Sequence, residues 1–309
     1  MFAFAHRCHP AAVILANGED VLDYLQSQWT VNLSLPGESR AVYGLRLSRK
    51  GHVLADAFLL REGKERFRIV SYDCPAEELI ALLKENVVAD DVEFVDETEG
   101  KEIISLWGQG TEVVCGQLGF APPTEQSFRR TEVGLVFFGR RTQSPNIEIL
   151  VNERQLERLT GLLTRVENAG TVRFADTNTL HFARMESGLP SIPMEIGPGE
   201  LPQEGGLENG SVDFDKGCYL GQEVMARIQS MGQVQRVLIP VKIDAEPPEI
   251  LPANLFLNDK KVGSLKSYFA RESDSSGLGM ALVRRENLPQ IRVSGLSLSP
   301  SDSSKIFPI

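Results

Sequence analysis

The same order of apolar and polar positions occurs twice in the first half of the chain. Each copy is a run of strand-forming residues followed by three leucines. The copies are residues 67–70 with Leu79, Leu82 and Leu83, and residues 147–150 with Leu159, Leu162 and Leu163. Leucines three and four apart mark one face of a helix, so each copy predicts a strand and an amphipathic helix. We expect two related α+β units with antiparallel sheets and with helices segregated to one side.

Local signals place the ends of some elements. Pro75 suits a first helical turn, because proline lacks only an N–H that has no partner there, and Asn152 suits the N-cap of the second helix. A further helix is expected over residues 19–29, and further strands at residues 42–47, 53–60, 103–106 and 135–138. Residues 192–210 are rich in Pro, Gly and Glu and predict a long loop, a kind of segment that is often functional.

After Arg236 the pattern changes to short apolar runs separated by turns. The expected strands are residues 237–243, 255–257, 261–269, 279–283 and 290–293, with Asn258 and Asp259 forming a tight turn. Such strands bury their apolar faces in a small β-barrel. We therefore expect two regions, residues 1–235 and residues 236–309, with a loose tail from residue 298.

Size and composition limit the class of protein. At 309 residues the chain exceeds the roughly 250–300 residues at which a single core stops growing, so more than one core is expected. No apolar run approaches the roughly 18 residues of a membrane span, and four cysteines without a CxxC pair favour reduced thiols. These features are typical of a cytoplasmic protein, and we expect no membrane partner.

Charge argues against direct binding of nucleic acid. The formal net charge is −10, whereas such binding requires a basic surface. Two local basic pairs, Arg129 with Arg130 and Arg140 with Arg141, are interpreted as solvated ends of strands. The ligand types at His6, Cys8 and His9 lack a distant partner motif, and we predict no metal site there.

The strongest chemical signal is Cys218, which lies between Gly217 and Gly221 with Lys216 close by. Glycines permit close approach of a ligand to the backbone, and a neighbouring cation raises the thiolate fraction of a cysteine. A small buried core cysteine is the alternative. A cysteine-protease-like dyad with His181 or His52 also stays open, because such partners meet in space and not in sequence.

Residues 216–223 read K-G-C-Y-L-G-Q-E and resemble the K-G-C-Y-x-G-Q-E signature of the YgfZ family, which are folate-binding relatives of the glycine-cleavage T-protein, an aminomethyltransferase. The run through Ala226 and Arg227 to Arg236 resembles the continuation of this motif. The segments around Arg184, residues 201–207, 22–28 and 48–56 are also similar, so the resemblance spans most of the chain. It departs at residues 29–32 and at His52, where relatives often have arginine.

The resemblance implies a three-part arrangement around a central pocket for tetrahydrofolate or another reduced folate. By resemblance to the T-protein, Glu204 accepts hydrogen bonds from the pterin, and Arg184 pairs with a carboxylate of the folate tail or of the protein itself. The pocket and its loop would also involve Tyr219, Gln222, Glu223 and Arg227. Asp56 keeps one of two acids that the T-protein pairs at this point, which weakens the case for aminomethyl transfer.

The implied function is a folate-dependent factor that supports assembly or repair of iron–sulfur client proteins and thereby tRNA modification. Cys218 would be its reactive group and Lys216 would tune that thiol. Such a factor need not turn over a substrate by itself. Two other classes stay open: a tetrahydrofolate-dependent aminomethyltransferase that relies on Asp56, and a non-catalytic interaction module that kept the fold.

Overall fold

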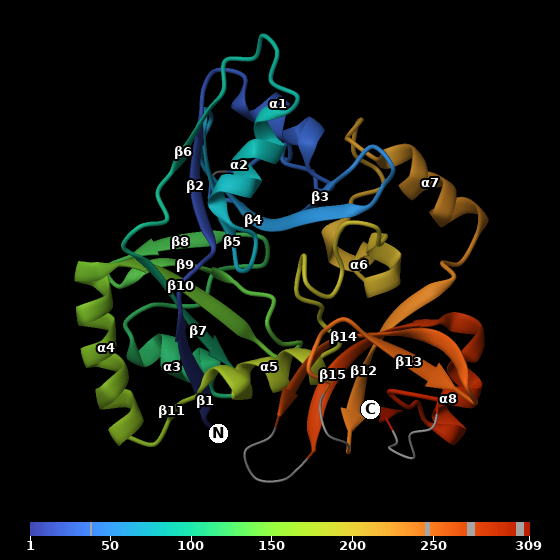
Figure 1. The fold of residues 1–309 in the computed structure, drawn as a ribbon. Coiled ribbons are helices and arrows are strands. Elements are labelled where there is room, and N and C mark those ends of the chain that lie inside the picture. Colours follow the sequence, from blue (N-terminus) through green and yellow to red (C-terminus); the bar gives the residue numbers. More distant parts are fainter. Residues whose placement is uncertain (38, 245–247, 271–275, 301–305) are drawn as a thin grey trace. The chain divides into compact units, whose positions relative to one another are not determined.

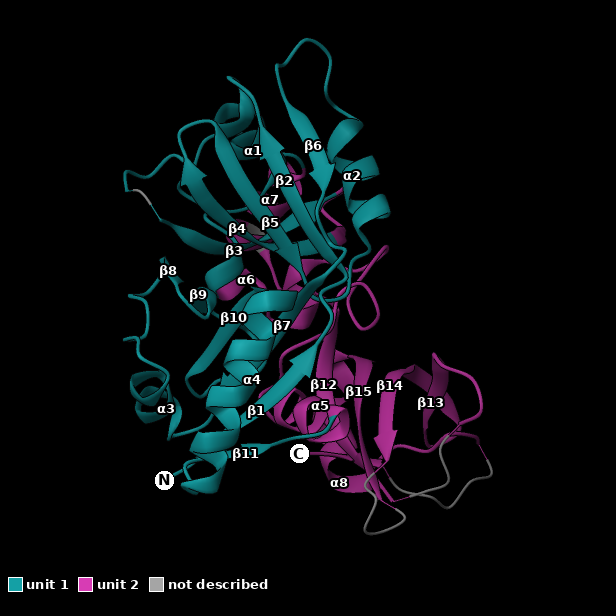
Figure 2. Ribbon diagram, turned by 90° about the vertical axis from the view of Figure 1, so that its left-hand side faces the viewer, with its two compact units in different colours: residues 1–47, 55–176, 210–220 teal, residues 48–54, 177–209, 221–309 magenta. Residues whose placement is uncertain are grey.

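The chain passes more than once between two units of the fold (Figure 1, Figure 2). The computed structural model describes residues 1–37, 39–244, 248–270, 276–300 and 306–309. Unit 1 consists of residues 1–47, 55–176 and 210–220, and unit 2 of residues 48–54, 177–209 and 221–309. Both contain strands and helices, which confirms the predicted α+β class.

Unit 1 holds two sheets. The first has the strand order β3-β4-β5-β2-β6 and the second β11-β1-β7-β10-β9-β8. The first sheet and its helices are β2 (Ala12–Asn17), α1 (Val21–Gln28), β3 (Ala41–Leu47), β4 (Val53–Gly63), β5 (Arg66–Ser71), α2 (Ala76–Lys84) and β6 (Glu93–Asp96). The second sheet and its helices are β1 (Ala3–Cys8), β7 (Lys101–Trp107), α3 (Thr111–Gln117), β8 (Phe128–Thr131), β9 (Gly134–Phe138), β10 (Asn146–Asn152), α4 (Glu153–Asn168) and β11 (Val172–Phe174).

One order of elements builds both sheets. A strand, a helix, three consecutive strands and a second helix occur as β2-α1-β3-β4-β5-α2 and again as β7-α3-β8-β9-β10-α4. In each copy the first strand pairs with the last of the three, antiparallel to it. Side chains of both sheets share one apolar cluster, in which the rings of Phe58 and Phe137 are 5.1 Å apart.

The repeated helices use equivalent positions. Leu79 and Leu83 of α2 are fully buried, as are Leu159 and Leu163 of α4. Asn152 is the N-cap of α4, as predicted: its side chain accepts from the backbone N–H of Gln155, whose own side chain accepts from the Asn152 N–H. This reciprocal pair satisfies two backbone donors that the helix leaves open.

Unit 2 contains a five-stranded antiparallel sheet in the order β13-β14-β15-β12-β16. Its elements are α5 (Thr177–Glu186), η1 (Pro202–Gly205), α7 (Gln222–Met231), β12 (Arg236–Ile243), β13 (Ala253–Leu257), β14 (Lys260–Ala270), β15 (Gly277–Arg284), η2 (Arg285–Asn287), α8 (Leu288–Ser294) and β16 (Ile306–Pro308); the short α6 (Glu208–Ser211) crosses the boundary to unit 1. The backbone of Leu296 forms an antiparallel β-bridge with Ile306 of β16, and that of Ser297 forms one with Phe256 of β13. Because β16 and β13 are the two edge strands of the sheet, this segment closes the sheet into a barrel. The turn at Asn258 and Asp259 has positive φ at both residues, which suits a tight hairpin.

Three sequence predictions are wrong. Residues 290–293 form part of α8 rather than a strand: Ile291 is buried, but Val293 is exposed, so the alternation of apolar residues did not mark a sheet face. The tail is not loose throughout, because residues 306–308 are a strand of the barrel; residues 301–305 lie outside the described ranges. The stretch 192–210 contains η1 and the start of α6. No helix in the part of the chain that the structure describes is long and apolar enough to span a membrane.

Candidate functional site

Lys216 fixes the segment that carries Cys218, residues 216–221, to the end of helix α1. Its ammonium donates hydrogen bonds to the carbonyl oxygens of Gln26, Trp29 and Val31, at 2.6, 2.6 and 2.8 Å. An ammonium has three N–H donors, and all three are used by these carbonyls. The side chain is buried, and burial lowers the pKa of Lys216 to about 8. Lys216 therefore anchors the segment, and the tuning of Cys218 by its charge stays a prediction.

Backbone hydrogen bonds hold the same two segments together on both sides of Lys216. The N–H of Asp213 donates to the carbonyl oxygen of Thr30 at 2.8 Å, and the N–H of Leu220 to that of Ser27 at 3.1 Å. The Thr30 hydroxyl donates to the Ser211 carbonyl oxygen at 2.5 Å. Trp29, at one of the positions where the chain departs from the YgfZ pattern, is fully buried.

Cys218 is the exposed cysteine; Cys74 and Cys115 are buried and Cys8 is half-buried, and none is in a disulfide. A buried core cysteine at position 218 is thus excluded. The two glycines beside the thiol differ. Gly221 has φ +86°, a conformation that favours glycine, whereas an added Cβ at Gly217 would meet nothing within 4 Å. Neither the backbone conformation nor the surrounding space therefore requires a glycine at position 217.

Asp56 belongs to a buried polar network in unit 1. Its carboxylate accepts from the Tyr43 hydroxyl at 2.6 Å and from the Cys74 thiol at 3.6 Å. Burial, partly offset by these hydrogen bonds, raises the pKa of Asp56 to about 6. A carboxyl group with such a pKa changes protonation near neutral pH, which suits a general base.

Arg184 pairs with a carboxylate of the protein itself, which is one of the two partners expected from the sequence. Its guanidinium donates to both oxygens of Glu195, at 2.7 and 2.8 Å, and both side chains are buried. Ser267 also donates to Glu195. The pair is a structural tie within unit 2.

Glu204 is buried, with 4% of its surface exposed, and is not the solvated loop acid that sequence alone would favour. Arg236 donates from Nε to Oε1 at 2.7 Å and from Nη2 to Oε2 at 2.9 Å. The Leu201 N–H also donates to Oε2, at 2.9 Å. A carboxylate offers about four acceptor positions, so roughly one is left on Oε1. The hydrogen bond to Glu204 raises the pKa of Arg236, which stays charged.

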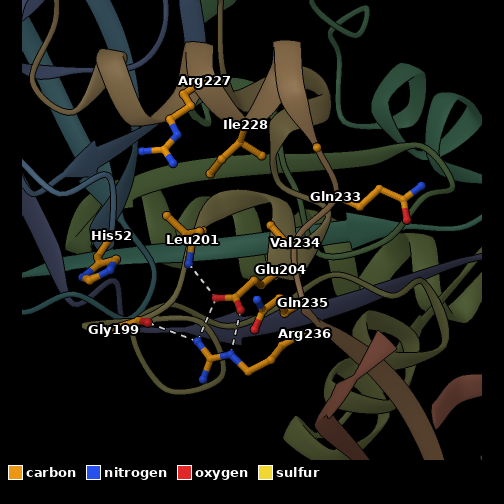
Figure 3. Close-up of a pocket in the computed structure, with 11 residues that line it drawn as sticks. His52, Gly199, Leu201, Glu204, Arg227, Ile228, Gln233, Val234, Gln235 and Arg236 are labelled. Carbon is orange, nitrogen blue, oxygen red and sulfur yellow. Dashed lines mark hydrogen bonds and ion pairs between the residues drawn. The ribbon is translucent and has the colours of Figure 1, made fainter. Parts of the chain in front are cut away.

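Glu204 lines a cavity of about 560 Å³ in unit 2 (Figure 3). Arg227 and Ile228 extend from α7 on the side opposite Glu204 and Arg236. His52, one of the positions at which the sequence departs from the expected motif, lines the cavity as well. The cavity combines a buried carboxylate, cationic side chains and apolar walls, and its volume is within the roughly 300–1,000 Å³ of small-molecule sites.

The structure brings together some of the predicted residues and not others. Glu204 and Arg227 share the cavity, whereas Gln222 and Glu223, which begin α7, are not among its lining residues. Tyr219 is buried, and the Lys216 ammonium lies 5.2 Å from the centre of its ring. Arg236 is the last residue of the motif's continuation, but the sequence pattern does not predict that its partner is Glu204. Its place at the end of the motif was the available signal.

The second basic pair is also corrected. Arg141 is not solvated: its guanidinium lies 3.8 Å from the Tyr72 ring centre, donates to the Cys8 sulfur and lies 3.7 Å from Glu148. Stacking on the ring and pairing with a fully buried acid keep it inside. The described residues contain no group of three or more His, Cys, Asp or Glu that could hold a metal ion.

The fold has a counterpart among solved structures. The structure resembles that of the glycine cleavage system aminomethyltransferase T from Bartonella henselae, with a TM-score of 0.76 over 99% of this chain and 88% of that one, at 17% identity. The chain thus has the fold of that aminomethyltransferase.

Curated relatives show similarity in sequence as well as in fold. The chain is 27% identical over 240 residues to the tRNA-modifying protein YgfZ of Hamiltonella defensa, covering 74% of this chain and 69% of the relative. It is 24% identical over 290 residues to YgfZ of Colwellia psychrerythraea, covering 91% and 86%. The resemblance to YgfZ proteins predicted from sequence is confirmed.

A second group of relatives carries another name. The chain is 26% identical over 263 residues to a mitochondrial iron–sulfur cluster assembly factor IBA57 homolog of Yarrowia lipolytica. The match covers 77% of this chain but only 54% of that relative, so the chain spans about half its length. No family model matches the chain.

Proposed function

We propose that the protein is a folate-dependent factor that supports assembly or repair of iron–sulfur proteins and thereby tRNA modification. The observation that carries the proposal is the buried Glu204 carboxylate in the wall of a cavity of about 560 Å³. The names of the relatives, iron–sulfur cluster assembly factor and tRNA-modifying protein, supply the pathway. Its partners would be folate and iron–sulfur client proteins. A cytoplasmic location also stays a proposal, since the IBA57 relatives are named as mitochondrial.

The lining residues fit a reduced folate. A pterin ring is flat and carries several N–H donors, which match a buried carboxylate between apolar side chains such as Leu201 and Ile228. A pair of donors needs two acceptor positions on Glu204. Roughly one is open on Oε1, and the second becomes open when Arg236, which donates to both oxygens, moves away. Its side chain is 41% exposed, so its guanidinium can turn outward when a ligand enters. Arg227, which is exposed at the other side, would meet the anionic tail of the ligand.

The central arrangement of three parts around this ligand is proposed on the aminomethyltransferase-like fold. Cys218 is proposed as the reactive thiol because it is exposed, whereas the other three cysteines are buried or half-buried. A single thiolate does not hold an iron–sulfur cluster, which usually takes four ligands. Cys218 would therefore act as a nucleophile, a redox-sensitive thiol or a transient ligand.

Calorimetric titration with tetrahydrofolate tests the pocket. We expect saturable binding by the wild type, loss of binding in Glu204→Gln, and unchanged binding in the control Glu286→Gln, whose side chain is 72% exposed in the same unit. Thermal melting of the variants checks that they are folded. Absence of binding by the wild type would reject the folate assignment and favour an interaction module.

Two observations favour a second candidate, a tetrahydrofolate-dependent aminomethyltransferase. The raised pKa of Asp56 suits a base at neutral pH, and the similar fold is that of an aminomethyltransferase. This candidate predicts folate-dependent transfer that is lost in Asp56→Asn but survives alkylation of Cys218. The first proposal predicts that alkylation of Cys218 abolishes function.

A further inference from the structure

A second cavity, of about 350 Å³, lies in unit 1 where the two sheets and the start of α4 meet. Three cations line it: Arg68 from β5, Lys101 from β7 and Arg130 from β8. Its other lining residues are polar or apolar, and no carboxylate is among them. Such a concentration of positive charge is unexpected in a chain whose formal net charge is −10.

Two carboxylates position the arginines from outside the lining. Glu62, whose side chain is 2% exposed, accepts from Arg68 Nε at 2.7 Å and lies 2.9 Å from Arg130 Nη2. Glu97 accepts from Arg68 Nη1 at 2.6 Å. Because Arg68 has five N–H donors and the two acids take three, donors remain for a ligand. The two acids thus hold the arginines in place and leave N–H donors of Arg68 available.

The charges do not balance within this group. Three arginines, Arg66, Arg68 and Arg130, share the two acids Glu62 and Glu97, which leaves an excess of one positive charge. Lys101 in the lining adds a second. Within the described ranges, Lys101 has no carboxylate partner within 4.0 Å. The Gln155 side chain, whose oxygen serves the capping pair of α4, adds an amide donor to the lining.

We propose that this cavity binds a phosphate dianion, either inorganic phosphate or the phosphate of a small ester. Guanidinium groups match phosphate oxygens with two parallel hydrogen bonds, and a lysine adds a point charge. Cations that reach the cavity from three strands surround a tetrahedral anion better than a planar carboxylate. The site is separate from the Glu204 cavity, since the two share no lining residue. It goes beyond the proposed function and does not depend on it.

Calorimetry at constant ionic strength tests the site with inorganic phosphate, AMP and succinate as probes. The variant is Lys101→Gln, which removes a cation that has no ion-pair partner in the described structure, so the fold is kept. The matched control is Arg129→Gln, which makes the same change of charge at the neighbour of Arg130, on the other face of β8. Melting temperatures of both variants verify folding.

We expect the wild type to bind a phosphate probe at one site, with a dissociation constant in the millimolar range or below. Lys101→Gln should weaken this binding about tenfold or more, which corresponds to the loss of one charge-assisted contact of about 1.4 kcal/mol. Arg129→Gln should change the affinity less than about twofold. Tighter binding of AMP than of phosphate assigns the site to an ester, and equal binding assigns it to the free ion. No saturable binding of either probe, equal losses in both variants, or succinate binding as tightly as phosphate overturns the proposal.

Discussion

The Lys216 ammonium donates to the carbonyl oxygen of Trp29 at 2.6 Å, across 187 positions of the sequence. The same nitrogen serves Gln26 and Val31, and Thr30 adds two further contacts to residues 211 and 213. The backbone that leads to Cys218 is therefore fixed to the end of α1, while the thiol itself is exposed. The structure therefore presents an exposed thiol on a backbone that hydrogen bonds hold in place.

Replacing Lys216 with Met leaves the three carbonyl oxygens without their donor. Unpaired buried polar groups are costly, so we expect the free energy of unfolding to fall by about 2–4 kcal/mol. Urea denaturation measures this change. A loss below about 0.5 kcal/mol would mean that water replaces the ammonium and that Lys216 is not an anchor.

Cys218 should react first with iodoacetamide. Burial raises the pKa of Cys74 and of Cys115 to about 12, and both side chains are shielded, whereas Cys218 is exposed. Mass spectrometry of peptides should show carboxamidomethylation at position 218 before any other cysteine. Cys218→Ala should change stability by less than about 0.5 kcal/mol, while Cys115→Ala, the buried control, should cost more. Equal labelling of all four cysteines would contradict this account.

Asp56 should make stability depend on pH. Its folded pKa of about 6 is above the ordinary value of 3.8, so the folded state binds the proton more tightly. Stability is therefore greatest below about pH 4 for this group and is lost as pH rises through about 6, by up to about 3 kcal/mol. The comparison of wild type with Asp56→Asn in urea at acidic and neutral pH isolates this group from the other carboxylates. We expect the variant to gain stability relative to wild type at neutral pH; identical pH profiles would show that Asp56 is not perturbed.

Removing only one member of the Arg184–Glu195 pair should lower the stability of the fold more than removing both charges. Arg184→Met leaves the fully buried Glu195 charge without its partner, and we expect a loss of about 3–5 kcal/mol. Adding Glu195→Gln removes that charge and should recover part of the loss. The control Arg158→Met breaks an exposed pair with Glu132 and should leave stability nearly unchanged in the same denaturation assay. Equal effects at the two sites would contradict the buried pair's role.

Sequence reasoning worked where a local rule decides the structure. The leucine spacing of residues 79–83 and 159–163 marks helix faces that do face the core, and the cap at Asn152 depends only on residues three positions away. The motif at residues 216–223 led to relatives that the comparisons confirm.

It did not work where distant partners decide. Ile291 and Val293 are two positions apart, as apolar residues on one face of a strand are, but only Ile291 is buried in the core. Arg141 is buried because it stacks on the Tyr72 ring and pairs with Glu148. Arg236, which follows α7 in the sequence, donates to Glu204, which precedes it. Nothing near Lys216 in the sequence indicates that its partners are carbonyl groups of residues 26–31.

The distance between Lys216 and its carbonyl partners also sets an order of events during synthesis. Position 216 follows Gln26 by 190 residues, and ribosomes add about 5–20 residues each second. The end of α1 thus emerges from the ribosome about 10–40 s before the side chain that completes it. During that interval the three carbonyl groups must remain hydrated, because the segment that carries Lys216 and Cys218 has not yet been synthesised.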